Sequence, residues 1–177
     1  MNNTPPTVRM QHTRNRTATG KRTTTPARQA ATYFAFGRQT QQPNGRQRGE
    51  WLGSDGKLHN HEAVLAWAKG QARQHEHTFQ ALLSVQQARL SDQDYMTALN
   101  VAGQIGDWRL VVHNDTNYSH AHVLFFRNQR LPRTQFEQWQ QQVQQALSDL
   151  EARCLAESEQ ALTLSEGSHM AAGLEWG

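Results

Sequence analysis

The segment that decides the fold reads HNDTNYSHAH at residues 113–122, and it lies between the apolar runs WRLVV at 108–112 and VLFF at 123–126. Both runs are short, rich in β-branched and aromatic residues, and bounded by turn formers, so each is predicted to be a strand. The polar residues between them favour a turn. The pattern therefore predicts two antiparallel strands joined by a short loop.

Three histidines of this segment are predicted to converge. Side chains alternate along a strand, so His120 and His122 project from the same side. His113, at the end of the partner strand, lies within reach of that side. A His-x-His pair alone on a strand is often incidental, but three imidazoles with Asp115 beside them indicate an open divalent-metal site.

The order His-x-Asp-Thr, polar loop, His-x-His and apolar strand resembles the HUH-type relaxases, in particular their plasmid-mobilisation group. Those enzymes nick one DNA strand at a transfer origin, with a divalent cation on the scissile phosphate and a tyrosine that attacks the phosphorus. The resemblance implies Mg²⁺ or Mn²⁺ on His113, His120 and His122, with Asp115 orienting or assisting a histidine. It also implies an antiparallel HUH-like sheet flanked by helices.

A short helix near the N-terminus carries the candidate nucleophile. Thr25 followed by Pro26 indicates its start and Gly37 its end. The run YFAFGR at 33–38 loosely matches the tyrosine-bearing helix of the relaxases. The resemblance therefore assigns Tyr33 as the catalytic nucleophile, which would form a 5′-phosphotyrosyl link.

Other interpretations of the tyrosines stay open. On its own, Tyr33 reads as an ordinary half-buried aromatic residue with its hydroxyl at the surface. Tyr118, between the histidines, could stack on a DNA base or replace Tyr33 as nucleophile, and Tyr95 is expected in the core.

Charge is unevenly distributed along the 177 residues. Residues 1–50 hold nine of the 18 Lys and Arg residues against one acid, a net charge of +8, whereas the remainder holds nine basic and 14 acidic residues, a net charge of −5. Residues 1–24 lack apolar periodicity and are predicted to be a disordered basic arm suited to phosphate backbones. A merely solubilising tail is the alternative. The predicted DNA-binding residues are Arg28, Arg38, Arg46, Arg48 and Tyr118.

Length and pattern predict one small α+β domain. We expect the relaxase-like domain at 25–157 and a flexible C-terminal tail at 158–177. Further helices are expected from about residue 60 to 74, after a Ser91 cap, and from Thr134 to about residue 156, with a strand at 78–84. His75, Glu76 and His77 form a second, weaker candidate cluster.

The sequence therefore predicts an enzyme that nicks single-stranded DNA at a transfer origin in plasmid mobilisation or conjugation, working with other relaxosome proteins. A single Cys, no long apolar run and no secretory signal predict a cytoplasmic protein without a membrane segment. Three alternatives remain: a non-catalytic origin-binding accessory protein on the same fold, a HUH-type replication initiator, and a metal-dependent hydrolase of small phosphoesters.

Overall fold

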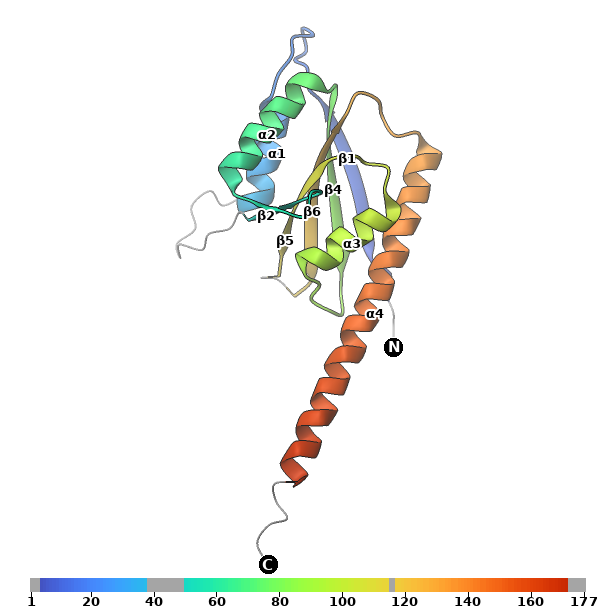
Figure 1. Cartoon of the computed structure of the whole chain (residues 1–177). Helices are drawn as coiled ribbons and strands as arrows, with labels where there is room; N and C mark the ends of the chain where they lie inside the picture. The colour runs from blue at the N-terminus through green and yellow to red at the C-terminus, as the bar shows by residue number, and fades with distance from the viewer. Residues whose placement is uncertain (1–3, 38–49, 115–116, 172–177) are drawn as a thin grey trace, which may run out of the picture.

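The computed structural model describes residues 4–37, 50–114 and 117–171, with side chains described up to residue 165. Ten elements follow one another along the chain (Figure 1): β1 (Thr7–Arg14), α1 (Thr25–Phe36), β2 (Trp51–Gly53), β3 (Leu58–His59), α2 (His61–Gln74), β4 (His77–Val85), α3 (Asp92–Ala102), β5 (Trp108–His113), β6 (Ser119–Arg127) and α4 (Arg133–Ala171).

All six strands belong to one antiparallel sheet with the order β1-β4-β6-β5-β2-β3. The long strands β4 and β6 pair along their whole lengths at its centre. The short strands β2 and β3 complete one edge, and β1 forms the other. The prediction of a small α+β domain with a central antiparallel strand pair is confirmed.

Helices cover both faces of the sheet, α3 and α4 on one and α1 and α2 on the other (Figure 1). Alternating residues of each strand supply the two cores, because successive strand side chains point to opposite faces. The larger core lies under α3 and α4 and includes Val8, Phe79, Leu83, Leu99, Val123 and Trp139. The smaller core lies under α1 and α2 and includes Ala31, Phe34, Val64, Val111 and Leu124.

Local capping explains where the helices begin. The Asn60 side chain accepts a hydrogen bond from the Ala63 amide at the start of α2, and Ser91 and Asp94 form a capping box at the start of α3. Helix α1 begins with Thr24 as its cap residue, one position before the Thr25 that the sequence indicated, and it has no side-chain cap bond. It ends at Gly37, as predicted, with φ +69°.

The prediction of a disordered arm over residues 1–24 is wrong for residues 7–14, which form β1. Val8 is buried and Met10 packs against the larger core, while Arg9 and Gln11 lie on the opposite face. The alternation of a strand is therefore present, but polar outward residues conceal it. Because β1 pairs with β4, the domain begins before residue 25.

The expected flexible tail from residue 158 is also wrong as far as Ala171, because α4 continues to that residue. Past the sheet the helix carries no apolar stripe to mark it, but Ala, Leu, Glu and Gln all favour helix. Figure 1 shows this part of α4 extending beyond the body of the domain. In the described part of the chain, no helix has the length and apolar character needed to cross a membrane.

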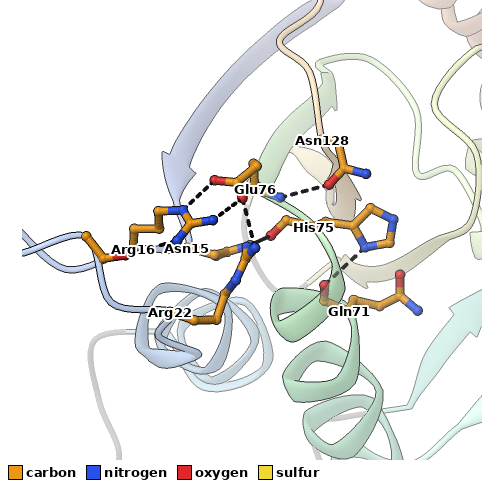
Figure 2. Close-up of polar contacts among 8 residues, drawn as sticks. Asn15, Arg16, Arg22, Gln71, His75, Glu76 and Asn128 are labelled. Atoms are coloured by element: carbon orange, nitrogen blue, oxygen red, sulfur yellow. Dashed lines mark hydrogen bonds and ion pairs between the residues drawn. The ribbon is translucent and has the colours of Figure 1, made fainter.

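A cluster of ionic hydrogen bonds fixes the connection between β1 and α1 (Figure 2). Arg16 forms a bidentate pair with the Glu76 carboxylate at 2.7 and 2.8 Å, and Arg22 donates to the same carboxylate at 2.8 Å. Arg22 and Asn15 also donate to the carbonyl oxygen of His75. Glu76 therefore ties the segment that leads into α1 to the start of β4.

We predict that Glu76→Gln lowers the free energy of unfolding at about pH 7. The Arg16 hydrogen bond is the main cause that lowers the pKa of Glu76 from 4.5 to about 2. Since the folded pKa is below the ordinary value, this stabilisation is present above about pH 4.5 and is lost as pH falls towards 2. The free energies of unfolding of the unaltered protein and of Glu76→Gln, measured in urea, should therefore become equal in acid.

Glu137→Gln is the matched control, because Glu137 forms a single, more exposed pair with Arg133 and such pairs contribute little. A Glu76→Gln effect that is no larger than this control, or that does not depend on pH, would contradict the assigned role.

Candidate active site

The β5–β6 hairpin brings the three predicted histidines to one face of the sheet. His113 pairs directly with His120, and His122 pairs with Val111, so the three side chains share the face that α1 covers. The centroids of the three imidazole rings lie 5.2 to 5.4 Å apart. The sequence prediction that these histidines converge is confirmed at the level of their placement.

Buried hydroxyl groups fix the end of β6 that carries these histidines. The Tyr95 hydroxyl donates to Ser119 Oγ at 3.0 Å, and Ser119 Oγ lies 3.4 Å from the carbonyl oxygen of Leu90. From β4, Ser84 donates to the carbonyl oxygen of Ser119. Ser119 immediately precedes His120, so α3 and β4 both restrain the position of the His120 backbone.

Phe34 of α1 contacts two of the histidines. Its ring stacks on the His122 ring with centroids 4.3 Å apart, and its carbonyl oxygen lies 2.7 Å from His113 Nε2. A carbonyl oxygen only accepts hydrogen bonds, so His113 Nε2 carries the proton here. The helix that bears Tyr33 is thereby bonded to the histidine cluster.

His122 is held as a neutral imidazole. Burial, with the charges of His113 and His120 as further causes, lowers its pKa from 6.5 to about 3. A neutral imidazole has a free electron pair on one ring nitrogen, which is the form that binds metal ions. The pKa of His122 therefore suits a metal ligand at neutral pH.

Tyr33 lies at the rim of the same cluster. Its ring centroid is 6.3 Å from that of His122, and 47% of its surface is exposed. Two hollows of about 380 Å³ each meet at Tyr33. One is lined by Arg28 and other residues of α1, and the other by Arg9, Gln11, Gln80 and His122. Tyr33 therefore lines both hollows.

The structure describes two of the other predicted site residues and leaves four undescribed. Arg28 is exposed beside Tyr33, and Tyr118 is exposed next to the histidines. Asp115, Arg38, Arg46 and Arg48 lie outside the described residues. The second candidate cluster does not join this site, because Glu76 is bound by two arginines and His77 lies at the opposite end of β4.

Arg9, Gln11 and Gln80 are site residues that the sequence interpretation missed. Gln11 and Gln80 face each other across β1 and β4, with their side chains 3.4 Å apart. They were missed because the β1 segment was taken for a disordered arm. The spacing of Val8 and Met10 was the signal that could have placed them.

Within the described ranges, no three His, Cys, Asp or Glu side chains already stand where they could hold a metal ion. The hydrogen bond between His113 and the Phe34 carbonyl gives one reason, since it occupies His113 Nε2. The donor set of three imidazoles, one of them held neutral, fits a first-row transition-metal ion, whereas Mg²⁺ would take most of its ligands from oxygen atoms. These side chains would have to rearrange to bind an ion.

We predict that the ring signals of His122 stay flat by NMR from about pH 8 to about pH 4, since its pKa is about 3. The unfolded chain binds a proton below about 6.5 and the folded chain does not, so this group lowers stability as pH falls through that range. Phe34→Leu should raise the midpoint of the His122 titration, because it exposes the His122 ring to water. Phe36→Leu is the control, since Phe36 contacts His61 instead. A His122 midpoint near 6.5 in the unaltered protein would contradict the burial argument.

We also predict that Tyr95→Phe lowers the free energy of unfolding by about 1 kcal/mol, the net contribution of one hydrogen bond. Tyr95 and Ser119 are both buried, so water cannot replace the missing hydroxyl. Tyr33→Phe is the matched control, because Tyr33 is an exposed residue, and this change should leave urea unfolding unchanged. Equal effects of the two variants would rule out an anchoring role for Tyr95.

Comparison with known proteins adds no relative to this picture. No protein-family model, no curated protein and no solved structure matches the chain. The function must therefore be argued from the arrangement of Tyr33 and the three histidines.

Proposed function

We propose that this protein is a relaxase-like endonuclease that nicks single-stranded DNA through a tyrosine, acting in the cytoplasm at a transfer origin during plasmid mobilisation or conjugation. The observation that carries the proposal is the position of Tyr33, an exposed phenol beside a cluster of three histidines on one face of an antiparallel sheet. A nucleophile beside a candidate metal site is the arrangement that covalent phosphoryl transfer needs.

The proposed metal ligands are His113, His120 and His122, with Asp115 assisting them. A divalent cation such as Mg²⁺ or Mn²⁺, when bound there, would withdraw charge from the non-bridging oxygens of the scissile phosphate. His122 is prepared for this role by its lowered pKa. To coordinate a cation through Nε2, His113 would first have to release the Phe34 carbonyl.

Tyr33 acts as nucleophile in this proposal. Its hydroxyl oxygen forms a bond to phosphorus, and the bond from phosphorus to the 3′ oxygen breaks. The phenol loses its proton and the departing 3′ oxygen gains one, so a 5′-phosphotyrosyl link and a free 3′-hydroxyl result. The exposure of Tyr33 leaves space for a DNA strand to approach.

Basic and aromatic residues around Tyr33 would position the strand. Arg28 and Arg9 line the two adjoining hollows, and guanidinium groups bind phosphate oxygens in bidentate fashion. The exposed Tyr118 could stack on a base. Arg38, Arg46 and Arg48 follow α1 in the chain and lie outside the described residues, and we propose them as further phosphate-binding residues.

A non-catalytic accessory protein that binds the same DNA is the second candidate. It is favoured by the absence, within the described ranges, of side chains set to hold a metal ion and by the hydrogen bond on His113. A HUH-type replication initiator would use the same residues on a replication origin.

The decisive experiment uses a library of single-stranded DNA, labelled at either end, with Mn²⁺ and a denaturing gel. We expect a protein–DNA adduct that keeps the 3′ label, because the phosphotyrosyl link joins the 3′ fragment to the protein. Tyr33→Phe should abolish it because the nucleophile is missing. A double variant, His120→Ala with His122→Ala, should do the same because cation binding is lost.

Tyr118→Phe is the matched control, since it removes a second exposed phenol near the histidines, and it should leave the adduct intact. An adduct that survives Tyr33→Phe but is lost in Tyr118→Phe would move the nucleophile. DNA binding without an adduct under any of these conditions would favour the accessory protein.

A further inference from the structure

A second group of basic side chains lies at the other end of the sheet, on the face covered by α3 and α4. Arg14 of β1 pairs with His77 of β4, and His77 pairs in turn with Arg127 of β6. Directly opposed residues share a face, so the three side chains form one cross-strand row. His12 lies two residues before Arg14 on β1 and projects to the same face. It contacts His77, with ring centroids 5.2 Å apart.

This row is distant from the candidate active site. His120 and Arg127 are seven residues apart on β6, which corresponds to about 23 Å along a strand. The histidines of the active site also project to the opposite face, towards α1. The two groups of residues are therefore separate.

His77 has an unmet hydrogen-bonding requirement. Its relative exposure is 8%, and its Nδ1 is buried with no hydrogen-bond partner. Leaving a buried polar atom unpaired costs about 1–3 kcal/mol. A native structure retains such an atom at a cost that a bound ligand can offset.

The surroundings of His77 are strongly positive. Burial lowers its pKa first, the charges of His12, Arg130 and Arg14 lower it further, and the charge of Glu76 raises it by less. Burial and then the charge of Arg130 lower the pKa of His12 as well. Among the described residues, neither Arg14 nor Arg130 forms an ion pair with an acid.

Glu76, the acid next to His77 in the chain, opposes these positive charges only weakly, as the smallest of the causes that act on the pKa of His77. Figure 2 shows its carboxylate turned towards Arg16 and Arg22, which bind both of its oxygens. Arg127 donates to the carbonyl oxygen of Gln104 and therefore keeps its full charge. Arg14 and Arg127 lie on the two strands that flank His77, so an anion bound near His77 would reduce the repulsion between these two charges.

We propose that Arg14, Arg130, His12 and His77 form a binding site for a phosphate group. The two guanidinium groups supply charge-assisted donors, and the imidazoles supply N–H donors from neutral rings. The site does not depend on the nicking activity proposed above, because it shares no residue with it. The same chemistry fits free phosphate, a phosphomonoester or a phosphodiester of a nucleic-acid backbone.

The test is an NMR titration of the full chain with inorganic phosphate, at constant ionic strength and about pH 7.5, where phosphate is mostly a dianion. The ring signals of His12 and His77 should shift and reach saturation, with a His12→Gln variant used for assignment. A double variant, Arg14→Ala with Arg130→Ala, should weaken binding by about tenfold or more because two charge-assisted donors are lost. Both arginines are exposed, so this variant should fold.

Arg89→Ala is the matched control, since Arg89 is an exposed arginine at the other end of β4, and it should leave the affinity unchanged. A second titration uses a single-stranded oligonucleotide without a terminal phosphate. If the oligonucleotide also shifts these signals and binds more weakly to the double variant, the site binds backbone phosphates. If only inorganic phosphate binds, the site takes free phosphate or a monoester. Shifts without saturation, or equal affinity in the double variant, would overturn the proposal.

Discussion

The contact between Phe34 and the histidine hairpin determines where the candidate nucleophile lies. The Phe34 ring is 4% exposed and stacks on His122, while its carbonyl oxygen accepts from His113. Neighbouring residues of a helix point about 100° apart. With Phe34 buried against the sheet, Tyr33 must emerge at the rim. The Arg16–Glu76 pair restrains the other end of this connection, so the placement of Tyr33 relies on both contacts.

The same contact links two requirements that compete. Burial under Phe34 keeps His122 neutral, which favours binding of a cation. The carbonyl of Phe34 also holds the proton of His113 Nε2 in place, which opposes it. A cation that binds this nitrogen must displace the Phe34 carbonyl oxygen. The C-terminal end of α1 would then lose its hydrogen bond to His113. In the proposed mechanism, cation binding and the position of Tyr33 would therefore be coupled through Phe34.

Local signals made much of this architecture predictable. The hairpin with His113, His120 and His122 followed from strand alternation, and the Asn60 and Ser91 caps marked two helix starts. The edge strand β1 was not predicted because its partner β4 is distant in sequence and its outward residues are polar. The extension of α4 was missed because the apolar stripe ends while helix propensity continues. Asp115 lies outside the described residues, so its role stays a prediction.

The basic residues on β1 fit more than one explanation. Edge strands commonly carry charged residues, lysine above all, that prevent pairing with other chains. The charged residues of β1, Arg9 and Arg14, are both basic, and Arg28 is the one charged residue of α1. Arg9 and Arg14 lie on opposite faces of the sheet, one near Tyr33 and the other beside His77. Protection of the edge accounts for basic residues on β1 in general, and the anionic ligands proposed above would account for one arginine on each face of the sheet.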